Sequence, residues 1–519
     1  MVVEARFYGA AGSQIRSSLG GKQLLLYDKE WNTRIMIDFG IEPDRWSYYY
    51  GFPWRPQKSR LLDIGQYFAL LPKIPGIYRE DWTKKTADSA IEFIFTHMHY
   101  DHTAGITALD ASMPLHMSVL TTEMLYIWQN LSGRTINQFI DLYQDNALGR
   151  SSTGEEKFLE SRLARIERNI KRFVPGDPFY VGRNEVTAHS VDHSSLDAVG
   201  FIIDSSIGKI ADGGDFRSRG RRPEDTERFL QKCLDEKIKY FIFEGSLLHF
   251  EHEGTEEDVT NAVIDVGKDK ALLTISFPPR DFDRLTSLYY AAVELNRMLV
   301  ITMGQAIYLK ALNGMYGFPK LNWKNIGIYV PPMSHRTIDD PFYGLDLTEK
   351  DYRIWQRKFV KIQRWKENED KIQRVSYEDI RDNQDKFLVT VSGNSAQLAD
   401  LLSQVHPSAG SLDIRSNPQG WTDEMRAQDE KRVKVAQDFG MHSGPKPDYF
   451  VPSIQRDMET IHVPGHHNSR ETKKILERLC ERDITIIPNH TLDPNRFKEL
   501  APAGAKIMIP DSASALELK

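Results

Sequence analysis

The densest group of chemically active residues in the chain is the run THMHYDH at residues 96–102. It holds three histidines and one aspartate, and it directly follows the apolar run IEFIF. Neutral imidazole nitrogens and carboxylate oxygens are ligands that suit zinc or manganese. If the apolar run is a strand, His97 and His99 can hold one metal while Asp101 and His102 turn back towards a second. The alternative is a chance cluster of surface histidines.

Four further segments combine histidine or aspartate with an adjoining apolar strand. They are 192–197 (DHSSLD), 213–216 (GGDF), 464–467 (PGHH) and 488–490 (PNH). A lone histidine is more often a surface or core residue than a ligand, but together these segments complete a ligand set for two metals. His189 is a rival to His193 for the third histidine of the first metal. His193 is preferred because it lies closer to the next strand.

Length and composition are those of an ordinary multidomain globular protein. The 519 residues suggest two or three domains, and 40% hydrophobic with 27% charged residues is typical of soluble proteins. No apolar run approaches the ~20 residues of a membrane span, and the N-terminus lacks a secretory pattern. Two cysteines are too few for a disulfide framework. We therefore expect a cytoplasmic protein without a membrane partner.

Periodicity predicts a mixed α/β fold. Between residues 258 and 303, helices alternate with strands, which indicates parallel β-α-β packing. Strands are also predicted at 240–244, 459–463 and 484–488. The segment 155–173 has apolar residues at helical spacing among many charges, which predicts a surface helix.

The motifs resemble those of a known family. HMHYDH matches the HxHxDH signature of the metallo-β-lactamase superfamily, and DHSSLDAVG, GGDF, GHHNSRE and PNHT follow in the order of its β-CASP branch, with the greatest similarity to ribonuclease J enzymes. The resemblance runs from about Gly12 to His490. It implies an αβ/βα sandwich with an inserted β-CASP domain of parallel β-α-β type. The implied domains are 1–248 and 456–519 for the sandwich and 249–455 for the insertion.

The resemblance also implies the ligands of two divalent ions, zinc or manganese. The first ion is assigned to His97, His99 and His193, the second to Asp101, His102 and His490, with Asp215 as the bridge. Two such ions about 4 Å apart can activate a water and stabilise the attacking and leaving oxygens of a phosphodiester. Asp101 is also placed to orient the water or to receive its proton.

Glu244 ends the apolar run YFIF, where a glutamate is unusual unless it has a function. In the enzymes that this chain resembles, the corresponding acid orients a histidine that protonates the leaving oxygen. Alignment forward from residue 462 makes that histidine His466, and alignment backward from residue 471 makes it His467. The alternative for Glu244 is a surface residue at a strand end.

Substrate contacts are suggested by three segments. Ser392, Gly393, Asn394 and Ser395 resemble a ribonuclease J loop and could cradle a phosphate, although a plain helix start has the same pattern. The loop with His467 and Ser469 resembles the one that forms the 5′-phosphate pocket of ribonuclease J, but it carries one extra residue and has Pro464 in place of serine, and both changes could alter the pocket. Arg217 begins a run of four arginines in six positions that could bind a phosphate backbone or simply be solvated.

The favoured function is a two-metal ribonuclease, endonucleolytic, 5′-exonucleolytic or both, with single-stranded RNA as its partner. His490 favours RNA by resemblance, since the DNA-repair members carry valine there. The alternatives are a DNA nuclease, a small-molecule hydrolase such as a lactonase or thioesterase, and a non-catalytic scaffold. The chain stops 29 residues after His490, so the usual C-terminal self-association domain is expected to be missing, which leaves the oligomeric state open.

Overall fold

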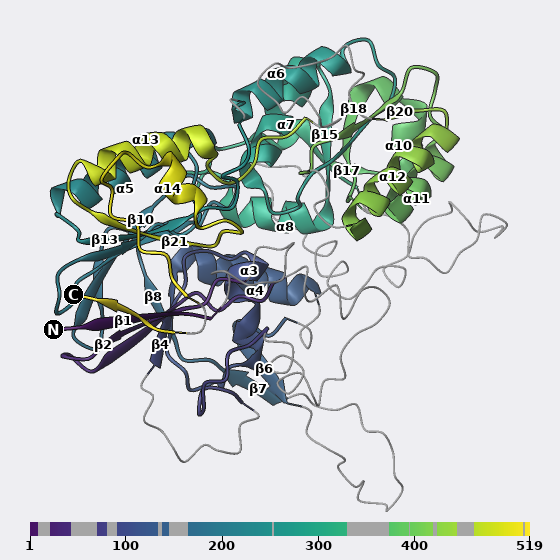
Figure 1. Ribbon diagram of the computed structural model, residues 1–519. Helices are drawn as coiled ribbons and strands as arrows, with labels where there is room; N and C mark the ends of the chain where they lie inside the picture. The colour runs from purple at the N-terminus through teal and green to yellow at the C-terminus, as the bar shows by residue number, and fades with distance from the viewer. Residues whose placement is uncertain are drawn as a thin grey trace, which may run out of the picture. The chain divides into compact units, whose positions relative to one another are not determined.

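The computed structural model divides the chain into two compact units (Figure 1). The first unit comprises Met1–Ser218, Arg222–Glu251 and Gly465–Lys519, and the second comprises Arg219–Arg221 and His252–Pro464. The second unit is thus inserted into the chain of the first.

Not every residue of the chain is described. The described residues are 1–8, 21–42, 70–79, 91–132, 137–144, 164–251, 254–329, 373–393, 395–418, 423–443, 461–511 and 514–519. The predicted domain boundary after residue 248 lies close to the observed division after Glu251. The second predicted boundary, after residue 455, falls outside the described residues.

The first sheet of the first unit combines antiparallel and parallel pairing. Its strand order is β22-β1-β2-β3-β4-β5-β8. The strands are β1 (Val3–Phe7), β2 (Leu24–Asp28), β3 (Thr33–Ile37), β4 (Ile91–Ile94), β5 (Leu115–Ser118), β8 (Ile170–Phe173) and β22 (Leu516–Leu518). Strand β1 pairs antiparallel with β22 and β2, whereas β3, β4, β5 and β8 run parallel. Helix α4 (Val119–Ser132) follows β5 and packs on β5 and β8.

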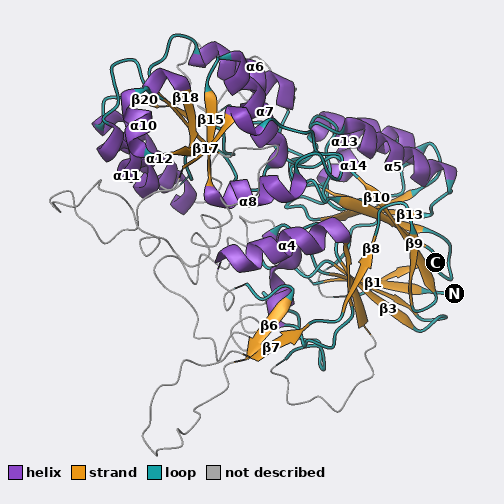
Figure 2. Cartoon of the chain, turned by 180° about the vertical axis from the view of Figure 1, so that it is seen from behind, coloured by secondary structure: helices purple, strands orange, loops and turns teal. Residues whose placement is uncertain are grey.

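The second sheet of the first unit has the order β21-β13-β12-β11-β10-β9. Its strands are β9 (Pro178–Val181), β10 (Asn184–Ser190), β11 (Val199–Ile203), β12 (Ile210–Asp212), β13 (Tyr240–Glu244) and β21 (Thr485–Asn489). Strands β12, β13 and β21 are parallel. Helices α5 (Pro223–Asp235), α13 (Ser469–Cys480) and α14 (Arg496–Leu500) lie on one face of this sheet (Figures 1 and 2).

Two apolar clusters hold these layers together. One joins the facing sides of both sheets, with Leu26 and Ile35 from the first and Phe201 and Ile242 from the second. The other joins the outer face of the second sheet to its helices. Along each strand the side chains either alternate in burial, as in β1 and β2, or are all buried, as in β11 and β13. A two-sheet sandwich with outer helices requires these patterns. The first unit is therefore layered as helix, sheet, sheet, helix.

The second unit is a parallel α/β unit. Its sheet has the order β17-β16-β15-β18-β14-β19-β20, and every pairing is parallel. The strands are β14 (Leu273–Ser276), β15 (Met298–Thr302), β16 (Ile326–Tyr329), β17 (Gln373–Val375), β18 (Phe387–Thr390), β19 (Leu412–Arg415) and β20 (His442–Ser443), and the helices are α6 (Glu256–Gly267), α7 (Phe282–Glu294), α8 (Met303–Leu312), α10 (Tyr377–Asp382), α11 (Ser395–Val405) and α12 (Asp423–Asp438). The parallel β-α-β packing predicted for residues 258–303 is present. Among the described helices of the chain, none is long and apolar enough to cross a membrane.

Two secondary-structure predictions are wrong for the residues that the structure describes. The predicted surface helix 155–173 is replaced at its C-terminal end by β7 (Ala164–Glu167) and β8, and residues 155–163 lie outside the described part. Strand β7 pairs with β6 (Asp141–Gln144), and β8 adds to the edge of the first sheet beside β5. Pairing with neighbouring strands, together with the burial of Phe173, stabilises strands here more than the helical spacing of the apolar residues favours a helix. Residues 461–463 of the predicted strand 459–463 form no strand.

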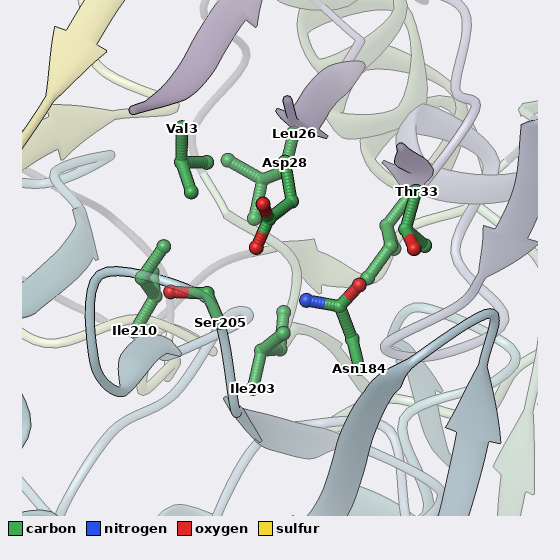
Figure 3. A pocket seen from close by; sticks show the side chains of 9 residues that line it. Val3, Leu26, Asp28, Thr33, Asn184, Ile203, Ser205 and Ile210 are labelled. Atoms are coloured by element: carbon green, nitrogen blue, oxygen red, sulfur yellow. The ribbon is translucent and has the colours of Figure 1, made fainter. Parts of the chain in front are cut away.

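A small cavity lies between the two sheets, among the side chains of both (Figure 3). Asp28, Thr33 and Asn184 supply polar groups among aliphatic side chains. Asp28 accepts hydrogen bonds from the backbone N and Oγ of Ser206 at 2.7 and 2.8 Å, which ties the two sheets together. None of the residues that line the cavity belongs to the histidine motifs.

A charge cluster on the first sheet leads to a prediction about acid stability. Oε2 of Glu92 lies 2.6 Å from Nε2 of His116 and 2.7 Å from Nζ of Lys171. The hydrogen bond from His116 outweighs burial and, with Lys171, lowers the pKa of Glu92 to about 2. A carboxylate whose pKa is lowered by folding stabilises the fold above its unfolded pKa, and the contribution is lost as the pH falls through the folded pKa.

Replacing Glu92 with glutamine should therefore lower the free energy of unfolding at pH 7 by about 1–2 kcal/mol, because solvent screens a partly exposed group. The difference from the wild type should be complete above about pH 4.5 and should shrink as the pH falls towards 2. Urea unfolding at pH 7, 5 and 3 measures it. A difference that is constant over this range would assign the effect to packing instead of charge.

Candidate metal centre

The first histidine motif leaves the first sheet at the end of β4. His97 and His99 lie in the loop after this strand, and the short helix α3 (Tyr100–Thr103) carries Asp101 and His102. His97 and His102 are fully buried, and His99 and Asp101 are partly buried. The strand, the loop and one helical turn therefore present four ligand side chains within six residues.

The first group of possible ligands is His97, His99 and His193, whose ligand atoms all lie within 4.8 Å of one another. Nε2 of His193 lies 3.2 Å from Nδ1 of His99. Nδ1 of His193 lies 2.6 Å from the carbonyl oxygen of Gly465, which can only accept, so Nδ1 carries the proton and Nε2 is left to bind a metal. His189 is not in this group; it lies on β10 and its ring contacts Phe229.

The second group is Asp101, His102, Asp215 and His490, again within 4.8 Å of one another. Oδ2 of Asp215 lies 3.0 Å from Nε2 of His102 and 4.0 Å from Nε2 of His490. It also lies 3.9 Å from Nε2 of His97, a member of the first group. Asp215 is thus the carboxylate that stands between the two groups.

The electrostatics of the two groups suit metal ligands. Burial, followed by repulsion from neighbouring imidazoles, lowers the pKa of His97 and of His193 well below 6.5, so both rings are neutral. Burial alone would raise the pKa of Asp215, but the charges of His102 and His490 hold it well below 3.8. Burial would lower the pKa of His102, but Asp215 and Asp38 raise it well above 6.5. Neutral imidazoles and ionised carboxylates are the forms that bind metals, so His102 would release its proton when a metal binds.

Orphaned polar atoms test whether these residues fit metal ions. Nε2 of His97 and Oδ1 of Asp215 are buried and have no hydrogen-bond partner among the described residues. Buried polar atoms are almost always paired, because an unpaired one costs about 1–3 kcal/mol. His97 belongs to the first ligand group and Asp215 to the second, and a bound cation would satisfy their unpaired atoms. The residues therefore fit a centre for divalent metals, and the donor set of histidine and carboxylate suits zinc or manganese.

Beside the second group lies a carboxylate–imidazole pair. Oε1 of Glu244, at the end of β13, lies 3.1 Å from Nδ1 of His466 and 3.4 Å from Nε2 of His467. His466 is 23% exposed and its Nδ1 lies 3.8 Å from Oδ2 of Asp215. Burial would lower the pKa of His466, but Glu244 and Asp215 raise it to about 9. Glu244 itself is 2% exposed, so it is not a surface residue.

His467 has a different environment. It is fully buried, its ring packs against Phe216 and Phe243, and its Nδ1 hydrogen-bonds with Oγ1 of Thr472 at 2.8 Å. Both histidines that the sequence left as alternatives therefore touch Glu244. Of the two, His466 is the one that is partly exposed and next to Asp215.

A second layer of charged residues was not recognised in the sequence. Asp38 directly follows β3. Its Oδ2 lies 2.9 Å from Nδ1 of His102, and its Oδ1 accepts the backbone N–H of Thr96 at 2.8 Å. Lys22 pairs with Asp38 and with Asp212, which ends β12. The sequence feature that could have identified the two acids is an aspartate at the end of an apolar run, Asp38 in RIMID and Asp212 in KIAD.

Close backbone packing fixes the first motif. A Cβ on Gly40 would lie 1.6 Å from the carbonyl oxygen of Asp101, so only glycine fits there. Gly214 has φ +62° and its Cβ would lie 2.6 Å from the carbonyl oxygen of Val199. Glycine at position 214 therefore lets the backbone before Asp215 pack closely against the strand that carries Val199.

The predicted substrate contacts fall into two sets. Ser392 and Gly393 follow β18 in the second unit, Ser395 begins α11, and Asn394 lies outside the described residues. The carbonyl oxygen of Ser392 accepts a hydrogen bond from Arg432 at 2.7 Å. This set belongs to the second unit, whereas the metal ligands all belong to the first.

The other predicted contacts are buried in the first unit. Arg217 is 1% exposed and its Nε lies 3.6 Å from Oδ1 of Asp192. Ser469 is 3% exposed, and its N and Oγ both donate to the carbonyl oxygen of Phe250 at 3.2 Å. His467, Arg217 and Ser469 are thus buried and make contacts inside the protein, so their side chains are not exposed to a substrate.

Comparisons with known proteins show a shared fold. No protein-family model matches the chain, and no curated protein matches it. A crystal structure of a protein of unknown function from Enterococcus faecalis V583 matches with a TM-score of 0.64 and 17% identity, over 100% of both chains.

Two metallo-β-lactamase-type structures match part of the chain. The metallo-β-lactamase fold protein YhfI from Bacillus subtilis has a TM-score of 0.26 and 12% identity over 48% of this chain and 74% of its own. Zn²⁺-bound PqqB from Methylobacterium extorquens has a TM-score of 0.27 and 11% identity over 47% of this chain and 73% of its own. At these scores neither likeness identifies a family, and what the comparisons show is the fold shared with the E. faecalis protein.

Proposed function

We propose that this chain is a two-metal nuclease that hydrolyses phosphodiester bonds in single-stranded RNA. The observation that carries the proposal is the pair of adjacent ligand groups with Asp215 between them, next to the pair of Glu244 and His466. This arrangement fits a metal-dependent hydrolase, because it combines metal ligands with a protonated imidazole at one site.

The chain's own residues would hold two divalent ions. His97, His99 and His193 would bind the first, and Asp101, His102 and His490 the second, with Asp215 shared. When bound, such ions supply a nucleophile at neutral pH and neutralise the charge that develops on the phosphate.

Protein side chains would perform the proton transfers. Asp101 is 26% exposed at its side chain and lies 3.4 Å from Nε2 of His490, where it can orient a water or accept its proton. His466 would donate a proton from Nε2 to the leaving oxygen, because its Nδ1 is directed at Glu244. Glu244 would hold the ring in place and stabilise its charged form.

RNA is proposed as the substrate on the strength of the sequence motifs. The order HMHYDH, DHSSLDAVG, GGDF, GHHNSRE and PNHT resembles that of the β-CASP nucleases, and His490 stands where the RNA-processing members carry histidine. The second unit, inserted between Glu244 and His466, stands where that branch has its own inserted domain. The choice between endonucleolytic and 5′-exonucleolytic cleavage is left to experiment.

Matched oligonucleotides test the proposal. RNA and single-stranded DNA of one sequence, each with a 5′-hydroxyl or a 5′-phosphate end, are incubated with the full chain loaded with Zn²⁺ or Mn²⁺. We expect cleavage of RNA and little of DNA. Equal cleavage of DNA would reject the RNA preference, and hydrolysis of a lactone or thioester with neither nucleic acid cut would reject the nuclease assignment.

A further inference from the structure

We infer that Lys22 is a positioning residue for the second ligand group, because it holds two buried carboxylates, Asp38 and Asp212, at one point. The inference rests on the proposed function only in requiring that the group bind a metal ion. It does not depend on the substrate.

Lys22 is a buried cation between two acids. It is 2% exposed, and its Nζ lies 2.5 Å from Oδ1 of Asp212 and 3.5 Å from Oδ2 of Asp38, both fully buried. Burial would lower the pKa of Lys22, but Asp212 and Asp38 raise it above 10.5, so the ammonium is charged. A buried charge is tolerated only when it is paired, so the three groups stay together.

Each carboxylate reaches one side of the second ligand group. Oδ2 of Asp38 lies 2.9 Å from Nδ1 of His102, which directs Nε2 of this ring towards Asp215. Oδ1 of Asp212 accepts the backbone N–H of Gly214 at 2.8 Å, and Gly214 directly precedes Asp215. Lys22 is therefore linked through Asp38 to one ligand and through Asp212 to another.

The backbone of Lys22 adds a third link. Its N–H donates to the carbonyl oxygen of Asp101 at 2.8 Å, and its own carbonyl accepts the N–H of Gly40 at 3.1 Å. Helix α3, which carries Asp101 and His102, and the loop after β12, which carries Asp215, are thus both connected to Lys22. Contacts outside the ligands that orient them are typically worth 10–100-fold in metal affinity.

Removal of the ammonium should have a specific effect. Asp38 and Asp212 would face each other without a cation, and their repulsion would move His102 and the Asp215 loop apart. His97 is linked to Asp38 indirectly, because Oγ1 of Thr96 lies 2.8 Å from Oδ2 of Asp38 and 3.0 Å from Nδ1 of His97. The first group should therefore be displaced less than the second.

The primary variant is Lys22→Met, which keeps an unbranched side chain one atom shorter than that of lysine and removes its charge. Calorimetric titration of the metal-free full chain with Zn²⁺, and the visible spectrum with Co²⁺, measure both sites without any substrate. We expect the second ion to bind at least about 10-fold more weakly, with a smaller loss of affinity for the first ion, which shares Asp215. Lys171→Met is the matched control, because it removes a lysine paired with Glu92 on the first sheet, and it should bind both ions as the wild type does.

A second variant separates charge from packing. Lys22→Met with Asp212→Asn removes one charge of each sign, and the asparagine oxygen can still accept from Gly214. We expect this double variant to recover at least part of the affinity for the second ion. Failure of Lys22→Met to fold, with folding restored in the double variant, supports the inference in the same way.

Two results would overturn the inference. One is wild-type affinity for both ions in Lys22→Met. The other is a double variant that binds or folds no better than the single one, which would assign the role of Lys22 to packing. A wild-type chain that binds both ions and cleaves no nucleic acid would reject the proposed function and leave the role of Lys22 standing.

Discussion

Replacing Asp215 with alanine is expected to abolish metal binding and catalysis together. Asp215 is 1% exposed, and its Oδ2 lies within 4.0 Å of a ring nitrogen of His97, of His102 and of His490. Its loss removes the carboxylate between the two ligand groups and leaves buried imidazoles with less negative charge around them. Because second-layer changes already cost 10–100-fold in metal affinity, the loss of this ligand should exceed about 100-fold. Metal content after dialysis and the rate of RNA cleavage measure the two effects.

Asp28→Asn is the matched control for the loss of a buried carboxylate in the same unit. Asp28 is 2% exposed, and its partners, such as Ser206, lie between the sheets and away from the ligand groups. This variant should lose stability and keep both ions. If Asp215→Ala retained two ions and the wild-type rate, the proposed metal centre would be rejected.

Replacing His466 with alanine should spare metal binding and slow turnover by about 10²–10⁴-fold, the usual contribution of a general acid. His466 belongs to neither ligand group, yet its Nδ1 lies 3.1 Å from Glu244 and 3.8 Å from Asp215. It is therefore placed to deliver a proton at the site and not to hold an ion. Single-turnover cleavage of labelled RNA, with metal content measured on the same sample, separates these roles.

His467→Ala is the informative comparison. His467 is fully buried between Phe216 and Phe243, so its truncation should lower the thermal stability more than the rate. Glu244→Gln should slow turnover in the same direction as His466→Ala, since the amide no longer stabilises a charged imidazole. If His467→Ala lost turnover and His466→Ala kept it, the general acid would be His467.

Much of the metal centre could be predicted from the sequence because its ligands lie next to strands. Four ligands lie within six residues shortly after β4: His97, His99, Asp101 and His102. Asp215 and His490 follow the parallel strands β12 and β21, whose carboxyl ends lie at the same edge of the sheet. His193 follows β10, which is antiparallel to β11. Strand β12 precedes Asp215, and β13 pairs with β21 in the register that sets Glu244 opposite Asn489, the residue before His490.

The second layer could not be predicted in the same way. The pairing of Lys22 with Asp38 and Asp212 depends on how three loops cross, and neither spacing nor composition encodes that crossing. The helix predicted at 155–173 failed for a related reason. Ile166, Ile170 and Phe173 have helical spacing, but pairing with β6 and β5 decides the structure of residues 164–173. The strand pairs are tertiary contacts, and they override local preference.

The insertion has a consequence for synthesis on the ribosome. Strand β13 and Glu244 emerge before the second unit, whereas β21, His466 and His490 emerge after it. The nascent first unit therefore waits with an unpaired edge on β13 while about two hundred further residues are translated. Because His490 is translated after the second unit, the second ligand group is complete only at a late stage of synthesis.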